Sequence, residues 1–352
     1  MKVCYFGIYD SNYPRNRILI DGLRENGAEV IECNSRASGL KKFFELYKKH
    51  RALQGNYDVM VVGYMGHLVV PLARLICRKR IVFDAFLSMY DSMVSDRGVC
   101  SPHSIRARYY YFLDWLSCRL ADRVLLDTQT HIEYFIKKFN VRREKFSRIL
   151  IGAHDAFFYP EQNKKAEHEK SFRVLWWGWM IPLHGVDYIL EAADILKNEE
   201  INFILIGRGA ERKRVESLKN NKKLENVTIQ DNVSVNNLLP FIHRADICLG
   251  IFGVTNKTQM VIPNKVYEAF AAKKALITAD TRASREILKD GVHCLLVRPG
   301  SGRELAEKIL YLKNNPKKME TIAEAGYNLY KEKCSQHILG KELFIILESY
   351  VT

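Results

Sequence analysis

The segment 261–286, VIPNKVYEAFAAKKALITADTRASRE, places a turn, a lysine and a glutamate at a spacing that suits phosphate and sugar chemistry. Pro263 fixes its own φ and lacks an N–H, so a helix is predicted to begin near Asn264 and Lys265. Lys265 and Glu268 would then lie on one helix face. Helix N-terminal N–H groups and Lys265 would hold a diphosphate, while Glu268 would accept from two ribose hydroxyls. A surface ion pair on an amphipathic helix explains the same spacing equally well.

Short β-rich runs alternate with helical patterns along the whole chain. In the first half, strands are predicted at 2–8, 28–34, 58–64, 80–86, 123–128 and 146–153. In the second half, they are predicted at 172–178, 201–207, 227–230, 247–253, 275–280 and 294–300. Strict alternation of strand and helix predicts α/β architecture with two doubly wound parallel sheets. Ligands bind outside the carboxyl ends of such strands, which is where the lysine and glutamate fall.

A chain of 352 residues is longer than one hydrophobic core usually serves, so two domains are expected. The run YPEQNKKAEHEK at 159–170 is charged and almost free of apolar residues, which is typical of a linker. The sequence therefore predicts a Rossmann-like domain over 1–158, a linker over 159–171 and a second such domain over 172–335. A last helix, over 336–352, could pack back on the first domain. We expect the two domains to face each other across a cleft.

Charge is distributed unevenly over a protein whose formal net charge is +14. Residues 1–155 hold 25 Lys and Arg against 16 Asp and Glu, and the remaining residues hold 29 against 24. The basic first half predicts an anionic partner, either nucleic acid, a lipid pyrophosphate or an acidic membrane surface. Nucleic acid is disfavoured because no helix-turn-helix, zinc or single-strand-binding signature is present. A nicotinamide enzyme is disfavoured because no G-x-G-x-x-G follows a first strand.

The cysteines and the apolar segments predict a cytoplasmic protein. Eight cysteines lie far apart, without a C-x-x-C pair or a histidine at ligand spacing, so we expect reduced thiols and no metal site. The N-terminus MKVCYFGIYD lacks the long apolar region of a signal peptide. The segment 59–77 contains glycine, proline, histidine and arginine, so it is predicted to be a strand and a helix rather than a membrane span.

Two helical segments mix aromatic and basic residues. They are LKKFFELYKKHRALQ at 40–54 and RARYYYFLDWLSCRL at 106–120. Either segment could rest on an anionic bilayer, as a peripheral membrane protein would, beside a lipid-linked acceptor. The alternative is a helix that packs on its own sheet and turns a basic face to solvent.

Several segments together resemble a known family. FRVLWWGWMIPLHGVDYILEAADIL, INFILIGRGAERKRV, IPNKVYEAFAAKKALITADTRASREIL and DGVHCLLVRPG are similar, in order and spacing, to the C-terminal half of retaining GT-B glycosyltransferases of family 4, the glycosyl transferases of group 1. The resemblance covers nearly all of 172–315. In the N-terminal half it rests on the βα rhythm and on segments such as FDAFLSMYDSMVSDR.

The resemblance implies the GT-B fold of two Rossmann-like domains, with the acceptor at the first and a nucleotide sugar at the second. It implies a retaining, metal-independent transfer from a nucleotide-diphosphate sugar to a glycan or lipid-linked acceptor in cell-surface polysaccharide synthesis. The nucleotide sugar is a substrate, and no cofactor is expected. A non-catalytic subunit that binds a nucleotide sugar is the alternative.

The family's functional residues match only in part. Glu268 is similar to the second glutamate of the family's E-x7-E element, which binds ribose, whereas the first glutamate would fall at Met260. The loop from Pro263 to Lys265 looks like the P-x-K variant that many members carry instead. The arginine and lysine that clasp the diphosphate would fall near Trp179 and His184, where neither is present.

Other residues are then expected to supply positive charge and donor contacts. The donor-binding candidates are Arg15, Gly178, Trp179, His184, Arg208, Asp231, Lys257, Pro263, Asn264, Lys265 and Glu268. Arg15 follows the first strand and either faces the diphosphate or begins a solvated helix. Asp84 and Asp91, at and after the fourth strand, are the catalytic candidates because the family often places a polar residue there, near the anomeric carbon. The alternative for Asp84 is a cap on its loop.

Overall fold

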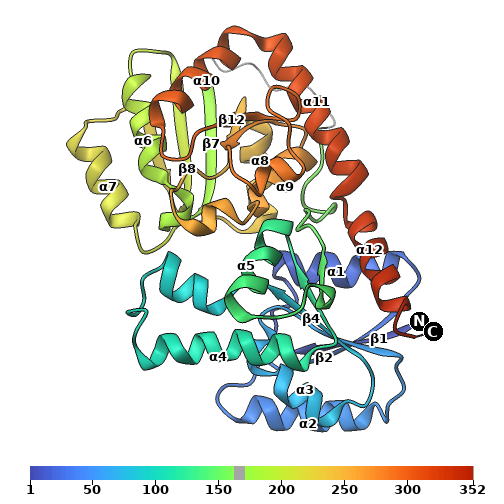
Figure 1. Cartoon of the computed structure of the whole chain (residues 1–352). Coiled ribbons are helices and arrows are strands. Elements are labelled where there is room, and N and C mark those ends of the chain that lie inside the picture. The colour runs from blue at the N-terminus through green and yellow to red at the C-terminus, as the bar shows by residue number, and fades with distance from the viewer. Residues whose placement is uncertain (162–170, 352) are drawn as a thin grey trace. The chain divides into compact units, whose positions relative to one another are not determined.

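The computed structural model describes residues 1–161 and 171–351 (Figure 1). The chain divides into unit 1, Met1–His154 with Ser335–Thr352, and unit 2, Asp155–Cys334. The division therefore falls at His154 rather than at residue 158. Most of the predicted linker, 159–171, lies outside the described residues.

Unit 1 is built on six parallel strands in the order β2-β1-β3-β4-β5-β6. They are β1 (Lys2–Gly7), β2 (Glu29–Asn34), β3 (Val59–Val62), β4 (Ile81–Phe86), β5 (Arg123–Leu126) and β6 (Phe146–Arg148). The sequences of β3, VMVV, and β4, IVFDAF, are buried throughout, as expected for a parallel sheet covered on both faces.

The helices of unit 1 follow their strands as the alternation predicts. They are α1 (Pro14–Glu25), α2 (Lys41–Ala52), α3 (Val70–Ile76), α4 (Ile105–Leu120) and α5 (Gln129–Phe139), with short helical turns at Gly66–Leu68, Asp91–Asp96 and Arg143–Lys145. Ser104 and Thr128 cap α4 and α5 by accepting from backbone N–H groups. Right-handed crossovers place α1 on one face of the sheet and α2 to α5 on the other, because the strand order reverses direction after β2.

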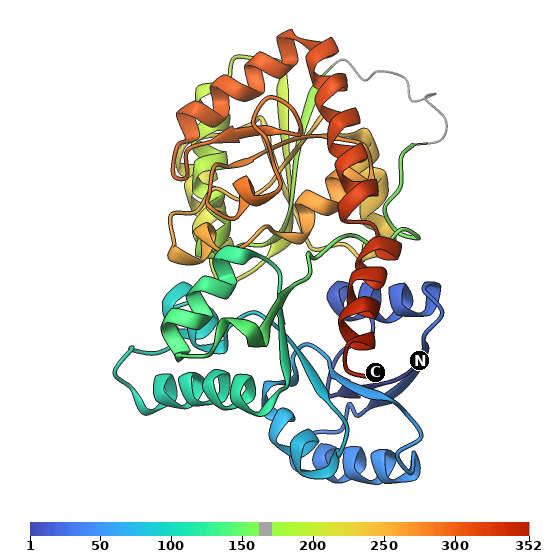
Figure 2. The ribbon, with the colours of Figure 1, turned by 45° about the vertical axis from the view of Figure 1, so that its right-hand side comes forward.

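The last helix of the chain, α12 (Gln336–Glu348), packs on α1 within unit 1 (Figure 2). Glycines make the close crossing possible. A Cβ on Gly22 would lie 2.5 Å from the Gln336 carbonyl oxygen, and one on Gly340 would lie 2.1 Å from the Gly22 carbonyl carbon. Asn26 also donates its side-chain amide to the His337 carbonyl at 2.9 Å. The C-terminal residues are therefore part of the core of unit 1.

Unit 2 repeats the plan with six parallel strands in the order β12-β11-β10-β7-β8-β9. They are β7 (Phe172–Trp179), β8 (Ile201–Arg208), β9 (Val227–Gln230), β10 (Ile247–Leu249), β11 (Ala275–Ala279) and β12 (Leu295–Val297). The helices are α6 (Val186–Ile195), α7 (Arg212–Asn221), α8 (Val235–Arg244), α9 (Asn264–Ala271), α10 (Gly302–Asn314) and α11 (Pro316–Lys333), with short turns at Pro182–His184, Asn256–Gln259 and Ser284–Glu286. Within the described ranges, no helix is both long enough and apolar enough to span a bilayer.

Candidate functional site

The helix α9 carries the lysine and the glutamate that the sequence singles out. Pro263 is extended, with φ −72° and ψ 155°, and the helix begins at Asn264, where the sequence predicts it. Lys265 and Glu268 are both buried, so the alternative of a solvated surface ion pair is wrong. In the described part of the chain no ion pair joins them. The two ionisable groups are therefore buried in unit 2 without a direct ion pair between them.

The ammonium of Lys265 is buried without a hydrogen-bond acceptor. Lys265 is only 4% exposed, and its Nζ has no hydrogen-bond partner among the described residues. The nitrogen lies 4.1 Å from the centroid of the Trp176 ring, whose face gives partial compensation. Burial lowers the pKa of Lys265 well below its usual range, although the charge of Glu268 opposes this shift. An orphaned buried donor in a native fold calls for a partner that the protein alone does not supply.

Glu268 is held in place by a tryptophan. Its Oε2 accepts a hydrogen bond from Trp177 Nε1 at 2.6 Å. Burial raises the pKa of Glu268 to about 7, while the Trp177 hydrogen bond and the charge of Lys265 lower it. The hydrogen bond from Trp177 to Oε2 thus orients the carboxyl group of Glu268. With a pKa of about 7, this group is close to half-ionised near neutral pH.

The backbone at the end of β7 passes directly over Lys265. Gly178 has φ +136°, and a Cβ there would lie 3.2 Å from Lys265 Nζ, so glycine keeps the space beside the ammonium open. The next residue, Trp179, is 54% exposed, and the Arg208 guanidinium at the end of β8 stacks 4.7 Å from the centroid of its ring. The carboxyl ends of β7 and β8 therefore present a glycine turn, an exposed indole and a guanidinium together.

His184 supports this turn from behind. It ends the short helical turn Pro182–His184 and is buried, with its ring 5.7 Å from that of Trp176. Its Nδ1 donates to the Trp179 carbonyl oxygen, and its own carbonyl accepts from Phe252 N–H at 3.0 Å. His184 therefore positions the backbone of the Gly178 turn.

The other candidates of unit 2 lie around this group with different exposures. Pro263 and Asn264 are half-buried at the start of α9, and Lys257 is buried in the turn Asn256–Gln259. Asp231 follows β9 and is paired with Arg212 Nη1 at 2.8 Å, although its side chain is 94% exposed. The structure thus brings Gly178, His184, Lys265 and Glu268 into one place.

The candidates Arg15 and Asp84 of unit 1 are corrected by the structure. Both side chains have no solvent exposure. Arg15 Nε donates to Asp84 Oδ2 at 3.0 Å, and Nη2 donates to Oδ1 at 2.9 Å. Burial disfavours the guanidinium, but the Asp84 carboxylate raises the pKa of Arg15 above its usual value, so Arg15 remains charged. Arg15 therefore lies in a buried ion pair with Asp84, rather than in a solvated helix start or in a loop that faces a diphosphate.

Arg15 also ends the last strand of unit 1 early. Its Nη1 donates to the carbonyls of Ile149 at 2.9 Å and Leu150 at 2.7 Å. The sequence predicts a strand over 146–153, but β6 stops at Arg148. These carbonyls bond the buried guanidinium instead of continuing the sheet.

Asp91 is corrected as well. The sequence places it in an open loop, whereas it begins the helical turn Asp91–Asp96 and is only 1% exposed. Its backbone N–H donates to Ser88 Oγ at 2.9 Å. The side chain is part of the interior of unit 1, so it does not lie open to a substrate.

The residue that sequence reasoning missed is Trp177, which the pattern FRVLWWG assigns to packing alone. Alternation along β7 puts Trp176 and Trp177 on opposite faces of the sheet. Trp176 fills the core beneath Lys265, and Trp177 donates to Glu268. A tryptophan at the carboxyl end of a central strand was the available signal, because a buried indole N–H needs an acceptor.

Comparison with known proteins shows which family the second part of the chain resembles. The model of the family described as "Glycosyl transferases group 1" matches residues 158–329. These 172 residues, just under half of the chain, are similar to the group 1 glycosyltransferases. Gly178, His184, Lys265 and Glu268 all lie within the range that the family model matches.

Two curated proteins and a solved structure are similar to this chain. An uncharacterized glycosyltransferase of Methanocaldococcus jannaschii is 27% identical over 168 residues, 45% of this chain and 44% of that protein. The alpha-D-kanosaminyltransferase of Streptomyces kanamyceticus is 25% identical over 64% of this chain and 60% of that protein. These matches therefore span less than two thirds of either relative.

Anabaena HepE, solved with UDP and glucose, is 16% identical and has a TM-score of 0.75, with 99% of each chain covered. This likeness and the two parallel six-stranded sheets confirm the predicted fold class, two Rossmann-like domains of GT-B type.

Proposed function

We propose that this protein is a glycosyltransferase that transfers a sugar from a nucleotide-diphosphate sugar, held by unit 2, to a hydroxyl of a glycan or lipid-linked acceptor. The observation that carries the proposal is the ammonium of Lys265, buried beside the Gly178 turn without a hydrogen-bond acceptor. A phosphate oxygen is the partner whose charge and size fit that position. The N–H groups at the start of α9 add further donors beside it.

Glu268 would hold the ribose of the same ligand. Trp177 already bonds Oε2, so the carboxylate is oriented before the donor arrives, and Oε1 is left to accept ribose hydroxyls. Trp179 and Arg208, exposed at the ends of β7 and β8, would contact the sugar and the phosphates.

The chemistry we propose is a transfer with retention of anomeric configuration. The bond between the anomeric carbon and the diphosphate oxygen breaks, and the acceptor oxygen bonds that carbon on the same face. The departing phosphate takes the proton of the acceptor hydroxyl. Lys265 and the α9 N-terminus would stabilise the negative charge that develops on the diphosphate, which is the main requirement of the step and does not call for a metal ion. A protein nucleophile is not required.

We propose further that the acceptor belongs to a cell-surface polysaccharide under synthesis and that the protein works at the cytoplasmic side of a membrane. UDP is the first nucleotide to test because it occupies the structure of HepE, and the kanosaminyltransferase names one sugar class that a relative transfers.

Titration calorimetry with UDP, GDP, ADP, CDP and dTDP tests the donor site. We expect one diphosphate to bind, Lys265→Met to weaken it by roughly 10- to 100-fold and Glu268→Ala to weaken it by a similar factor, because each removes a charged hydrogen bond. The matched control is Lys273→Met, since Lys273 lies just past α9 and pairs with Glu324 on the surface. The proposal fails if none of the five binds, or if Lys265→Met binds as the wild type does.

A second candidate is a subunit that binds a nucleotide sugar without transferring it. It is favoured by Trp179 and His184, which stand where the resemblance implies an arginine and a lysine, and by the use of His184 as a backbone support. Incubation with nucleotide sugars and membrane lipids separates the two candidates. A transferase releases nucleoside diphosphate in an amount equal to the glycosylated product, whereas a binding subunit releases none.

A further inference from the structure

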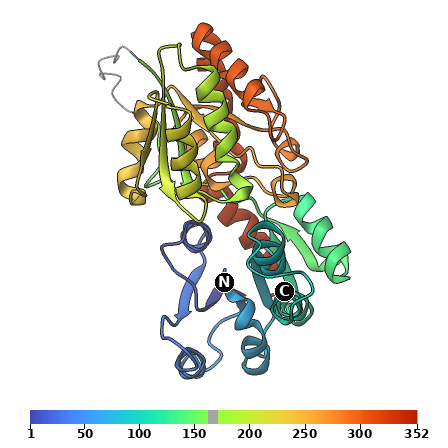
Figure 3. The ribbon, with the colours of Figure 1, turned by 90° about the vertical axis from the view of Figure 1, so that its left-hand side faces the viewer.

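Three helices of unit 1 form one layer on the sheet face opposite α1. The helix α2 neighbours α3, and α3 neighbours α4, in both Figure 1 and Figure 3. The inner sides of these helices pack on the sheet through residues such as Leu46, Ala73 and Leu113, which are buried. Their outer sides are therefore free of the rest of unit 1, and the composition of those sides is unusual.

The outer side of α4 carries an apolar stripe. Ile105, Tyr109 and Phe112 are spaced to lie on one helix side, and all three are exposed, Ile105 by 87%. The side of α4 that faces the sheet buries Ala107, Leu113 and Cys118, together with Asp114 and Ser117. An apolar stripe that meets solvent on the outer side of a helix is the pattern of a surface that another apolar medium covers.

The helices α2 and α3 continue the same pattern. Leu40, Phe44 and Tyr47 stand on the outer side of α2 at the spacing of the α4 stripe, and Leu40 is 83% exposed. Leu75 on α3, between the other two helices, is 85% exposed. We call these seven apolar residues, with the basic side chains around them, the α2–α4 face.

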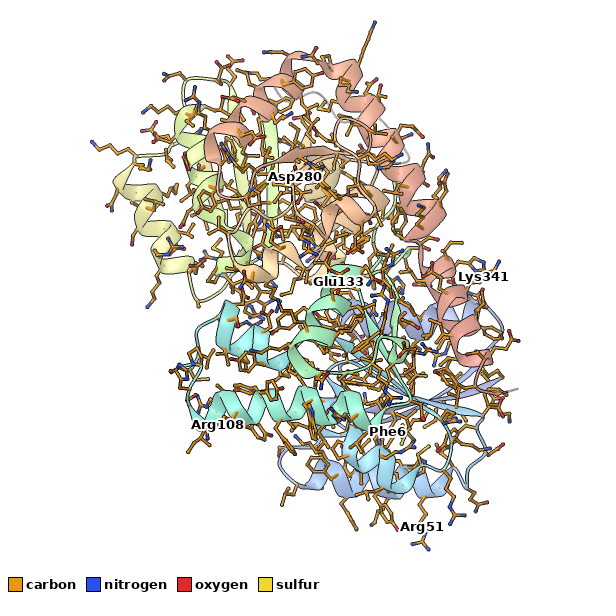
Figure 4. The ribbon with its side chains drawn as sticks, in the orientation of Figure 1. Phe6, Arg51, Arg108, Glu133, Asp280 and Lys341 are labelled. Carbon is orange, nitrogen blue, oxygen red and sulfur yellow. The ribbon has the colours of Figure 1, made fainter. Side chains whose placement is uncertain are left out.

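Every exposed charged side chain within α2 and α4 is basic. They are Lys41, Lys48, Lys49, Arg51, Arg106, Arg108 and Arg119. The two acids of these helices are engaged elsewhere, since Ser35 Oγ donates to Glu45 at 2.7 Å and Ser88 Oγ donates to buried Asp114 at 2.7 Å. Figure 4 labels Arg51 and Arg108 on the outside of these helices. The apolar stripes are thus bordered by positive charge alone.

We propose that the α2–α4 face docks on an anionic lipid bilayer. Headgroups would neutralise the lysines and arginines, and the aromatic and aliphatic side chains would enter the boundary between headgroups and acyl chains. Long basic side chains suit this arrangement because their stems extend along the apolar surface while their charges reach the phosphates. The face belongs to unit 1 and contains no residue of the donor site, so the proposal stands whether or not transfer is confirmed.

Co-sedimentation of the full chain with phosphatidylcholine vesicles, with and without phosphatidylglycerol, tests the proposal. We expect binding that requires phosphatidylglycerol and weakens as salt is added. The variant Arg106→Gln/Arg108→Gln should bind about fivefold more weakly for each arginine removed. The variant Ile105→Ser/Tyr109→Ser/Phe112→Ser should lose about tenfold or more, because the apolar contribution disappears. Ile195→Ser, at an exposed position of α6 in unit 2, is the matched control and should bind as the wild type does.

Circular dichroism of each variant checks that these exposed substitutions leave the fold intact. Should the triple variant unfold, the two-arginine variant and a Phe44→Ser/Tyr47→Ser variant on α2 carry the test. Equal binding to vesicles without phosphatidylglycerol overturns the proposal, as does vesicle binding that the substitutions do not change. Loss of self-association by the triple variant in analytical ultracentrifugation, without any vesicle effect, also overturns it and makes the face a contact between copies.

Discussion

Each unit buries a cation and a carboxylate near the carboxyl ends of its strands, and the two pairs are built in opposite ways. In unit 1, Arg15 donates to both oxygens of Asp84 and to two backbone carbonyls. In unit 2, Lys265 has no acceptor within the described residues, and Glu268 is held by a tryptophan rather than by the lysine. The charges of Arg15 and Asp84 are joined by hydrogen bonds, whereas Lys265 and Glu268 are not hydrogen-bonded to each other.

The difference teaches where a ligand can bind. A buried charge without a partner lowers stability, so its presence in a fold indicates that a partner arrives from outside. Arg15 already donates its hydrogen bonds within the protein, so an added anion could bind it only by breaking the Arg15–Asp84 ion pair. Lys265 loses nothing internal when a phosphate approaches. The buried pair of unit 1 thus serves structure, whereas we propose that the lysine and glutamate of unit 2 serve binding.

The largest effect is expected from Asp84→Asn, which leaves the Arg15 charge buried without its partner. The free energy of unfolding, measured by urea denaturation, should fall by about 3–5 kcal/mol. Asp10→Asn is the control, because Asp10 and Arg36 form an exposed pair that should contribute no more than about 1 kcal/mol. The double variant Arg15→Met/Asp84→Leu should recover most of the loss. Equal losses in the single and double variants would contradict the role of the pair.

The next effect concerns the pH dependence of stability at Glu268. Its pKa in the folded protein is about 7, above the ordinary value of 4.5, so the folded state keeps a proton that the unfolded state has lost. Stability from this group is full below the unfolded pKa and is lost as pH rises through the folded pKa. Glu268→Gln keeps an acceptor for Trp177 and should remove this loss, which is on the order of 3 kcal/mol. Calorimetric unfolding at about pH 5 and about pH 8 measures the difference. A constant difference between variant and wild type would contradict it.

Lys265→Met should separate stability from binding. Removing an orphaned buried ammonium should raise the free energy of unfolding by roughly 1–2 kcal/mol, the reverse of the Asp84 result, while nucleotide affinity falls. Denaturation and titration of the same preparation test both signs. Lys273→Met is again the control, with little change in either quantity. A destabilised Lys265→Met protein would mean that Lys265 has a structural role like that of Arg15.

The smallest effect is a proton linkage in nucleotide binding. Because burial lowers the pKa of Lys265, the amine releases its proton at lower pH than usual, and a bound diphosphate would restore it. Binding should therefore take up as much as one proton, and affinity should fall by up to about tenfold per pH unit above the lowered pKa. Calorimetry in buffers of different ionisation enthalpy measures the uptake. The Lys265→Met variant should show none, and equal uptake in both proteins would contradict the linkage.

The elements and their order could be predicted from local pattern, because strand and helix periods differ and because Pro263 cannot continue a strand. The start of α9 at Asn264 and the six strands of each sheet follow from this. The sequence also placed Lys265 and Glu268 on one helix face. The strand predicted over 146–153 was wrong after Arg148. The carbonyls of Ile149 and Leu150 accept from Arg15, which is more than a hundred residues away in the chain.

By itself, the sequence determined the repeated doubly wound architecture and the spacing of the Lys265 and Glu268 pair, since both depend on interactions between near neighbours. Only the tertiary structure decided which buried charges have a hydrogen-bonded partner within the protein. Arg15 and Asp84 meet across 69 positions, and Trp177 reaches Glu268 across 91. The cost of burying a charge depends on every group that the fold brings within hydrogen-bond reach, and local pattern does not contain that information.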